Sequence, residues 1–310
     1  MLTIVIPSYN HSRYIKNCLE AAIECDNSRI IVIDDGSTDD TVRVVEAFID
    51  EHNQFDITLI SKPNAGLISS LNMGLAATTT EYFYIVASDD IPDASGIIKC
   101  IKHLDANKEV KFCIGGADAF YDEEPNLFFN VYGSSQDRFL RLPPHKRFKQ
   151  ALFNYPVPLL LQSTVFRTSV LKELGGWNTE LMLDDYPMFV KLLVAYPDYG
   201  LGFAYLPEIS VVKYRQHQTN SFRNIPRQYG IVSEAVQFFA SGFLGDLATA
   251  KALAYYSLVA IRSQNTEALS KIVNESSYKI CFFSLFYFVE IPLARIVNYF
   301  KNAISRNKAI

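Results

Sequence analysis

Apolar residues follow two alternating patterns along the first part of the chain. Short apolar runs at residues 2–6, 30–33, 57–60 and 82–86 have the length and composition of buried strands. Between these runs, apolar residues recur every three or four positions, which predicts helices, the first of them capped by Ser12. Strands that alternate with helices predict parallel pairing and an α/β fold. The predicted helix faces are Ile15, Leu19, Ala22 and Ile23, then Val42, Val45, Phe48 and Ile49, then Leu67, Leu71 and Leu75.

The pattern weakens from Gly115 and Gly116 onward. Residues 116–161 mix aromatic, proline and charged residues without a clear period, which predicts loops and short strands but assigns them no role. The later pattern divides the chain into a layered domain over residues 1–222 and a helical extension over residues 223–310. The remaining predicted elements are a helix near Leu171, a turn at residues 175–177, a helix entered through Asp184 and Asp185, a strand at 209–214, and helices beyond 224.

The C-terminal segment is rich in apolar residues. The run at residues 280–289 is shorter than the roughly 20 residues of a spanning helix, and Glu290 and Pro292 are expected to interrupt it. The residues that follow form an amphipathic pattern typical of a helix lying in a lipid headgroup layer, although a core helix packed on the preceding domain has the same pattern. The apolar face is Leu293, Ile296, Val297, Phe300 and Ile304, and the polar residues off it are Arg295, Asn298, Lys301 and Arg306.

Composition narrows the possible partners and compartment. A chain of 310 residues that is 49% hydrophobic can bury a large core, so extensive disorder is not expected. A formal net charge of -4 lacks the basic excess of proteins that bind nucleic acid phosphates, so nucleic acid is not an expected partner. The five cysteines form no CxxC pair, and their odd number favours a reducing cytosol. The first residues have the pattern of a core strand rather than of a secretory signal.

Two acidic segments follow predicted strands. Residues 34–39, DDGSTD, come after the second strand, and residues 88–90, SDD, come after the fourth. Because the loops at the carboxyl ends of parallel strands converge, the two segments are expected to share one crevice. Paired carboxylates there could recruit a divalent cation that neutralises a diphosphate. The alternative for Asp89 and Asp90 is an N-cap of the helix predicted near Asp93.

Four segments of this sequence resemble the inverting family 2 glycosyltransferases in order and spacing. The resemblance covers about residues 1–220. It implies a GT-A-like, Rossmann-related domain with a mixed, mainly parallel sheet and a C-terminal helical extension. Residues 1–115 would be the nucleotide-binding half and residues 116–222 the acceptor-binding half. The four segments are TIVIPSYN at 3–10, VIDDGSTD at 32–39, NAG at 64–66 and SDD at 88–90.

The resemblance assigns a nucleotide site to the first half. Pro7 and Tyr9 would border the base, and Asp35 would accept a hydrogen bond from the uracil or its ribose. Asn64 and Gly66 would lie beside the nucleotide, where glycine permits a close backbone approach, or would simply form a turn.

Asp34 and Asp39, in the same motif as Asp35, are expected to shape their loop or cap the next helix.

The resemblance also implies a divalent metal, Mn²⁺ or Mg²⁺. Asp89 and Asp90 would supply the ribose contact and the metal ligands, with Asp90 as the principal ligand. Many relatives carry one more Asp where this sequence has Ala87, so only two carboxylates remain. The residues YRQH at 214–217, followed by Asn220 and Ser221, resemble the closing motif of bacterial surface-polysaccharide members. There His217 would complete the metal shell and Arg215 would balance phosphate charge, the alternative for His217 being a structural role.

An inverting transfer needs a base that deprotonates the acceptor hydroxyl. Asp184 and Asp185 resemble the Glu-Asp pair of the family, which implies that Asp185 is the base and that Asp184 contacts substrate. The alternative is an acidic helix start favoured by the helix dipole. Trp177, the only tryptophan, would stack on an acceptor sugar or pack in the core.

These expectations describe one enzyme. It would transfer a hexose of the Glc, Gal or GlcNAc type from a UDP-sugar to a sugar on a polyprenyl diphosphate, forming a β-linkage in O-antigen or capsule biosynthesis. It would be peripheral at the cytoplasmic face of the inner membrane. A sugar nucleotidyltransferase would need a glycine-rich, basic loop after the first strand, which residues 7–10 do not provide. A non-catalytic module that binds nucleotide or glycan remains an alternative because of Ala87.

Overall fold

The structure is a computed structural model that describes residues 1–153, 159–217 and 224–307, and the side chains of this chain up to Ala294. The chain folds into two compact units. The sheet unit comprises residues 1–151 and 156–217, and the helical unit comprises residues 152–155 and 218–310. The predicted boundary after residue 222 falls in a segment that the structure does not describe.

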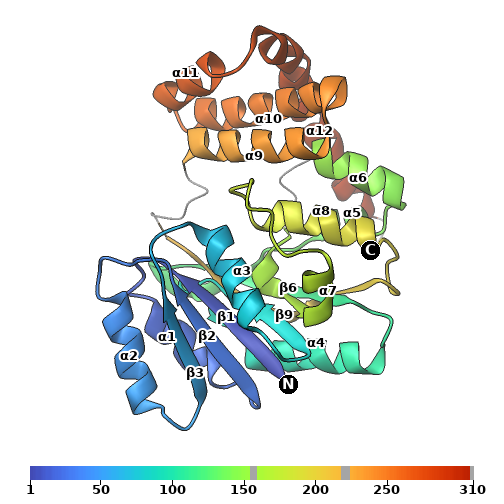
Figure 1. Cartoon of the computed structure of the whole chain (residues 1–310). Coiled ribbons are helices and arrows are strands. Elements are labelled where there is room, and N and C mark those ends of the chain that lie inside the picture. Colours follow the sequence, from blue (N-terminus) through green and yellow to red (C-terminus); the bar gives the residue numbers. More distant parts are fainter. Residues whose placement is uncertain (154–158, 218–223, 308–310) are drawn as a thin grey trace. The chain divides into compact units, whose positions relative to one another are not determined.

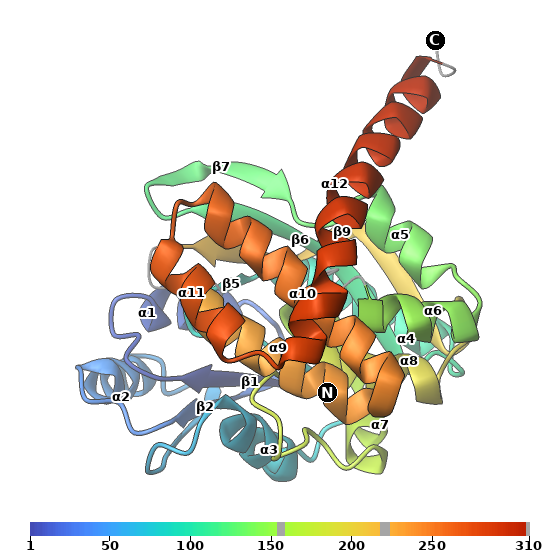
Figure 2. The ribbon, with the colours of Figure 1, turned by 90° about the horizontal axis from the view of Figure 1, so that it is seen from above.

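The first half of the sheet unit confirms the alternating pattern. Helix α3 lies on one face of β1 and β2, while α1 and α2 lie on the other (Figures 1 and 2). The predicted cap was wrong: Tyr14 precedes the first helical residue without a side-chain cap, and the Ser12 N–H donates to Asp39 instead. The elements are β1 (Leu2–Ser8), α1 (Ile15–Ala22), β2 (Ser28–Asp34), α2 (Thr41–Glu51), β3 (Asp56–Ser61), α3 (Leu67–Ala77) and β4 (Tyr82–Ile85).

The second half is more regular than the sequence predicts. Residues 116–161 contain most of a long strand, a hairpin and two helices rather than loops and short strands, and the strand predicted at 209–214 is part of a longer one. The elements are β5 (Ile91–Pro92), α4 (Ala94–Ala106), β6 (Phe112–Tyr121), β7 (Glu124–Asn130), α5 (Ser134–Leu140), α6 (Pro144–Phe153), η1 (Leu161–Ser163), β8 (Thr164–Arg167), α7 (Thr168–Glu173), α8 (Asp185–Ala195) and β9 (Phe203–Gln216).

These strands form one mixed sheet in the order β3-β2-β1-β4-β8-β6-β9-β5, with β7 paired to β6. Strands β3, β2, β1 and β4 are parallel, and so are β6 and β9. Strand β8 runs antiparallel to both β4 and β6 and so joins the two parallel groups. The mixed, mainly parallel sheet of the predicted α/β fold is therefore confirmed.

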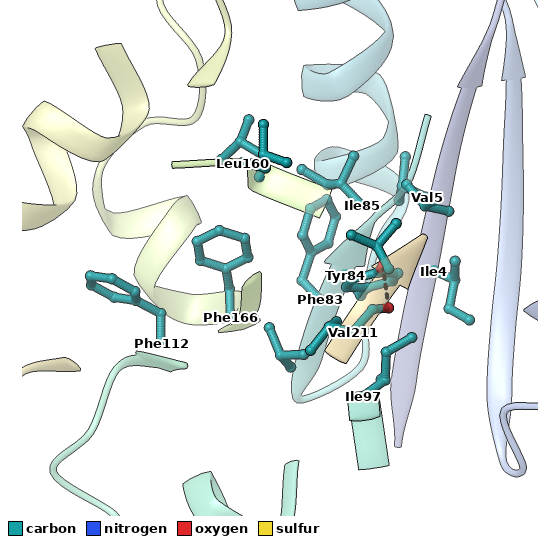
Figure 3. Packing of buried hydrophobic residues seen from close by; sticks show 14 of the residues in the cluster. Ile4, Val5, Phe83, Tyr84, Ile85, Ile97, Phe112, Leu160, Phe166 and Val211 are labelled. Atoms are coloured by element: carbon teal, nitrogen blue, oxygen red, sulfur yellow. Dashed lines mark hydrogen bonds between the residues drawn. The ribbon is translucent and has the colours of Figure 1, made fainter. Parts of the chain in front are cut away.

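The core is centred on β1 and β4. Ile4, Val5, Phe83 and Tyr84 are fully buried and pack side by side (Figure 3). The buried Tyr84 hydroxyl donates to the carbonyl of Gln162, at 2.7 Å, so burial costs it no hydrogen bond. Strands that are apolar on both faces require covering layers on both sides, as the helices provide.

The helical unit contains α9 (Ile225–Phe239), α10 (Gly242–Arg262), α11 (Thr266–Asn274) and α12 (Tyr278–Asn307). Glu290 and Pro292 end the apolar run but not the helix, because α12 continues through both. A proline inside a helix removes one hydrogen bond. Packing of buried Ile280, Tyr287 and Ile291 and the ion pair of Lys251 with Glu290, at 3.0 Å, offset that loss. Among the described residues, no helix combines the length and apolarity needed to cross a bilayer.

Candidate functional site

The two acidic segments lie at the same edge of the sheet. Strands β1, β2 and β4 are parallel neighbours, so the loops after them emerge together. The loop after β1 joins the other two: the His11 N–H donates to Thr41 Oγ1 at 2.9 Å, and its ring Nδ1 lies 2.7 Å from Ser88 Oγ. Asn10 Oδ1 accepts from the Thr38 N–H at 2.8 Å. We call this edge, with its three loops, the strand-end edge.

Pro7 ends the hydrogen-bond ladder between β1 and β4. The Val86 N–H donates to the Val5 carbonyl at 3.1 Å, and the next rung would run from the nitrogen of residue 7 to the Val86 carbonyl. Proline has no N–H, so that rung cannot form. Tyr9, two residues after Pro7, is 46% exposed, so its side chain is accessible to a ligand.

Asp35 holds the loop after β3. Its carboxylate is buried and accepts from the N–H groups of Ala65 and Gly66, both at 2.9 Å, and pairs with the buried ammonium of Lys62. The resemblance assigns Asp35 to the uracil or ribose, whereas here these loop donors engage both oxygens. In the structure, Asp35 therefore shapes the loop after β3.

The backbones of the loops after β2 and β3 approach each other closely. Gly36 has φ 74°, and a Cβ built on it would lie 2.8 Å from the nitrogen of Asn64, so no other residue fits without movement. Gly66 has φ 84° and precedes α3, with open space around it, which agrees with the turn that was the alternative for it. Asn64 and Gly66 are both exposed at the strand-end edge.

The neighbouring acids shape their loop as expected. Asp34 Oδ2 accepts from the N–H groups of Gly36 and Ser37, at 3.1 and 3.0 Å. Asp39 accepts from Thr41 and from the Ser12 N–H, and its pKa is lowered to about 2, because these hydrogen bonds outweigh the effect of burial.

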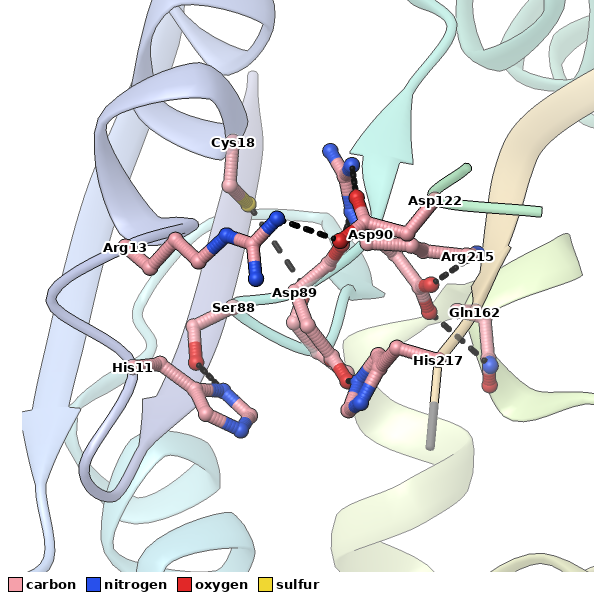
Figure 4. A network of polar contacts seen from close by, with 11 residues as sticks. His11, Arg13, Cys18, Ser88, Asp89, Asp90, Asp122, Gln162, Arg215 and His217 are labelled. Carbon is pink, nitrogen blue, oxygen red and sulfur yellow. Dashed lines mark hydrogen bonds and ion pairs between the residues drawn. The ribbon is translucent and has the colours of Figure 1, made fainter. Parts of the chain in front are cut away.

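Asp89 faces His217 across the sheet. Its Oδ2 lies 2.9 Å from His217 Nε2, although 128 residues separate them (Figure 4). Burial alone would raise the pKa of Asp89, but the hydrogen bond from His217 and the charge of His11 outweigh it, so the pKa lies below its ordinary value. Asp89 is therefore an ionised carboxylate beside an imidazole.

Asp90 has a different environment. It is 1% exposed, and its carboxylate accepts from the Arg215 N–H at 2.8 Å and from Gln162 Nε2 at 3.2 Å. Burial and the charge of Asp89 raise its pKa. The N-cap alternative for the pair was wrong, because Asp93 caps α4 through the Gly96 N–H at 2.9 Å. Asp90 ties the acidic loop to β9.

These residues fit a divalent cation held by two protein ligands. A cation held by both side chains would replace the hydrogen bond between them. Ligands on adjacent corners of an ion, each about 2.1 Å from it, lie roughly 3 Å apart, close to the 2.9 Å between Asp89 Oδ2 and His217 Nε2. Asp90, the principal ligand that the resemblance implies, accepts one protein hydrogen bond at each oxygen. Within the described ranges no cluster of three or more His, Cys, Asp or Glu side chains is placed to hold a metal, so phosphate and water oxygens would complete the shell.

Arg215 is built into the protein rather than presented to a phosphate. Its guanidinium pairs with Asp122 at 2.7 Å, donates to the Asp89 carbonyl at 2.7 Å and lies 4.8 Å from the Phe120 ring centroid (Figure 4). Arg13 reaches the same Asp122 at 2.8 Å. This differs from the direct phosphate contact that the resemblance implies. Asn220 and Ser221 of the same motif lie outside the described residues.

The candidate base lies at the N-terminus of α8. Burial and the charge of Asp184 raise the pKa of Asp185 to about 8, and burial raises that of Asp184. Burial and then the charges of Asp90, Asp89 and Asp185 raise the pKa of the Tyr214 phenol. A carboxyl group that ionises near neutral pH suits proton abstraction.

Trp177 belongs to the core, which was the alternative for it. The side chain is 3% exposed and its ring lies 6.3 Å from that of Phe83. Its backbone is bound twice by the Asn72 amide, at 2.8 and 2.9 Å. The indole is therefore not presented to an acceptor sugar.

Sequence reasoning missed four residues of this network: His11, Tyr14, Asp122 and Gln162. His11 and Tyr14 follow the recognised motif at 3–10 directly, and that position was the available signal. Asp122 and Gln162 lie in the region without a period, where no signal marked them.

Comparisons with known proteins identify the family of this chain. Residues 3–174 match the family Glycosyl transferase family 2. Glycosyltransferase GlyG of Streptococcus pneumoniae serotype 4 is 27% identical over 176 residues, a match that spans 54% of this chain and 58% of GlyG.

Two solved structures are similar in fold. TarS from S. aureus, in complex with UDP-GlcNAc, has a TM-score of 0.57 at 16% identity and covers 90% of this chain, which covers 82% of it. The mannosyltransferase PcManGT from Pyrobaculum calidifontis, in complex with GDP-Man and Mn²⁺, has a TM-score of 0.56 at 17% identity, covering 94% of this chain and 85% of its own. Because the family match covers more than half of the sequence and the site carries its motifs, the protein belongs to glycosyl transferase family 2.

Proposed function

We propose that this protein transfers a hexose of the Glc, Gal or GlcNAc type from a UDP-sugar to a lipid-linked sugar by a single inverting displacement. The observation that carries the proposal is the contact of Asp89 with His217 at the strand ends, in a chain that belongs to glycosyl transferase family 2 and has a half-buried carboxyl, Asp185, at the start of α8. A cation site and a base near one another are what this displacement requires, because charge leaves on one side of the anomeric carbon while a proton leaves on the other.

The displacement balances without a further reactant. Asp185 accepts the proton of the acceptor hydroxyl, and that oxygen forms a bond to the anomeric carbon. The bond from this carbon to the diphosphate breaks, and UDP departs with the electron pair. A divalent cation held by Asp89 and His217 would neutralise the departing diphosphate. Attack opposite the leaving group inverts the centre, so an α-linked donor gives a β-linkage.

The donor class rests on the strand-end edge and on the structural neighbours. TarS binds UDP-GlcNAc and UDP, whereas PcManGT binds GDP-Man with Mn²⁺. Exposed Tyr9 and Asn64, with the loop that Asp35 shapes, would border the nucleoside. A donor screen over UDP- and GDP-sugars with Mn²⁺ and a GlcNAc-diphosphate-lipid mimic tests the proposal. Nucleotide binding without turnover of any donor would instead indicate a non-catalytic module.

Replacing Asp89 with Asn should raise the Mn²⁺ concentration needed for half-maximal turnover about 10- to 100-fold, because the amide keeps the shape of the carboxylate but loses its charge. Chelation with EDTA should abolish wild-type turnover, and added Mn²⁺ should restore it. Asp26→Asn, an exposed acid elsewhere in the sheet unit, is the control and should behave as wild type. Turnover that survives EDTA would exclude the metal from the proposal.

The lipid-linked acceptor and a place at the inner face of the cytoplasmic membrane, in O-antigen or capsule assembly, are part of the same proposal. One face of α12 supports it, since large apolar side chains recur there at helical spacing although solvent surrounds them. An exposed apolar stripe of this kind is typical of an interaction surface. The stripe consists of Tyr278, Phe282, Leu285, Phe286, Val289 and Leu293, each between 55% and 96% exposed.

The double substitution Phe282→Glu and Phe286→Glu should lower binding to vesicles about tenfold or more, because burial of each ring in the interface is worth about 1.5–3 kcal/mol. Co-sedimentation with vesicles of phosphatidylethanolamine and phosphatidylglycerol measures the effect. Both rings are about 70% exposed, so folding should be unaffected. Ile261→Glu, an exposed apolar position on α10, is the control. Equal binding by the double variant and wild type would remove α12 from the proposal.

A further inference from the structure

The Tyr14 side chain lies among His11, His217 and Arg215 at the strand-end edge, although the proposed reaction assigns it no role. Its ring is stacked on the imidazole of His217, with centroids 5.1 Å apart and an interplanar angle of 25°. The ring of His11 meets it edge-on at 5.9 Å and 84°. The guanidinium carbon of Arg215 lies 5.1 Å from the Tyr14 centroid. The guanidinium carbon of Arg13 lies 5.3 Å from the same centroid, so one half-buried phenol ring contacts two imidazoles and two cations.

Both imidazoles are bonded to the acidic loop. His11 Nδ1 lies 2.7 Å from Ser88 Oγ, and His217 Nε2 lies 2.9 Å from Asp89 Oδ2. Ser88 and Asp89 are adjacent, so the two histidines form hydrogen bonds with consecutive residues. Tyr14 is the side chain that touches both rings.

A hydrogen bond at one nitrogen fixes a point of an imidazole but not the plane of the ring. A cation ligand needs both, because its lone pair lies in the ring plane. His217 comes directly after the end of β9. The stacked ring of Tyr14 constrains the plane of its imidazole.

Tyr14 is itself held in place. Arg215, which lies against its ring, is buried and fixed by Asp122 at 2.7 Å and by the Asp89 carbonyl at 2.7 Å. Tyr14 also immediately precedes α1, whose first residue, Ile15, is fully buried in the core. The ring that orients His217 is thus anchored by the backbone on one side and by a buried cation on the other.

We propose that Tyr14 is a positioning residue that fixes the ring plane of His217, and so aims its Nε2 at the site shared with Asp89. The effect on cation binding rests on the proposed function, whereas the orientation of the His217 ring exists without metal. The aromatic ring carries this role, since the described contacts of Tyr14 run through its face and edge.

Tyr14→Leu should weaken Mn²⁺ binding in the presence of UDP about 10- to 100-fold, as loss of a group that orients a ligand does. Tyr14→Phe keeps the ring and should bind within about twofold of wild type. Calorimetric titration of the full chain with Mn²⁺ and UDP measures both. Leucine is apolar but smaller than tyrosine, so thermal melts of both variants are needed to show that the fold is intact.

Proton NMR of metal-free protein tests the orientation alone. A ring proton of His217, assigned by its absence in His217→Ala, should be shifted upfield by the stacked phenol, should keep that shift in Tyr14→Phe and should lose it in Tyr14→Leu. An unchanged shift in folded Tyr14→Leu, or unchanged Mn²⁺ affinity, would overturn the role of Tyr14. If wild type shows the ring shift but binds no Mn²⁺ with UDP, the cation of the proposed function fails while the positioning of His217 stands.

Discussion

Replacing Asp185 with Asn lowers kcat about 10²- to 10⁴-fold, because the amide cannot accept the proton of the acceptor hydroxyl. Nucleotide binding should persist, since the nucleoside and cation residues lie at the strand-end edge. Turnover of a UDP-sugar and calorimetric binding of UDP, measured on the same preparation, separate the two effects. Wild-type turnover by Asp185→Asn would contradict the assignment of the base.

The pH dependence follows from the same carboxyl group. Burial and Asp184 raise the pKa of Asp185 to about 8, and the base acts only when deprotonated. The rate kcat/KM should therefore increase with pH below about 8 and level off above it. Glu180→Gln, an exposed acid in the same loop, is the control and should leave both the rate and its pH profile unchanged.

Replacing Arg215 with Met should lower the free energy of unfolding of the sheet unit by about 3 kcal/mol, because it leaves the mostly buried carboxylate of Asp122 without its buried partner. Urea denaturation followed by tryptophan fluorescence measures this, since Trp177 lies in the core of the unit. The variant should also lose turnover, because Arg215 carries the guanidinium that holds the Asp89 carbonyl.

Arg13→Met is the matched control for that effect. Arg13 binds the same Asp122 at 2.8 Å, but its side chain is 74% exposed, so water screens the pair and the expected loss is about 0–1 kcal/mol. Equal losses in the two variants would show that burial does not distinguish the two ion pairs, contrary to this account.

Local pattern was sufficient to predict the fold of the first half. Strands β1 to β4 contain short, mainly apolar runs, and α1 to α3 carry their apolar faces at helical spacing, so each element is encoded within its own residues. The second half depends on distant partners. Gly115 and Gly116 lie inside β6 because a Cβ on either would meet β9, at 2.2 Å from Val211 and 2.3 Å from the Pro207 carbonyl oxygen. When that neighbouring strand is unknown, two glycines in a row only weaken the predicted pattern.

The site could be predicted in its parts but not in its pairings. The motifs identified Asp89, Asp90, Asp185 and His217 from sequence alone. Which carboxylate faces His217 depends on the direction in which the loop leaves β4, and that direction is set by contacts to β9, 125 and 128 residues away. The sequence therefore favoured Asp90 as the cation ligand, whereas the structure pairs Asp89 with the imidazole.

Pro7 sets the point at which the chain after β4 stops being strand. Any other residue there would regain an amide hydrogen and could extend the β1 ladder to the Val86 carbonyl, in competition with the contact of His11 and Ser88. A missing hydrogen atom in the first strand thus decides where the fourth strand gives way to loop. Because Pro7 has no N–H, the acidic residues after β4 can leave the sheet.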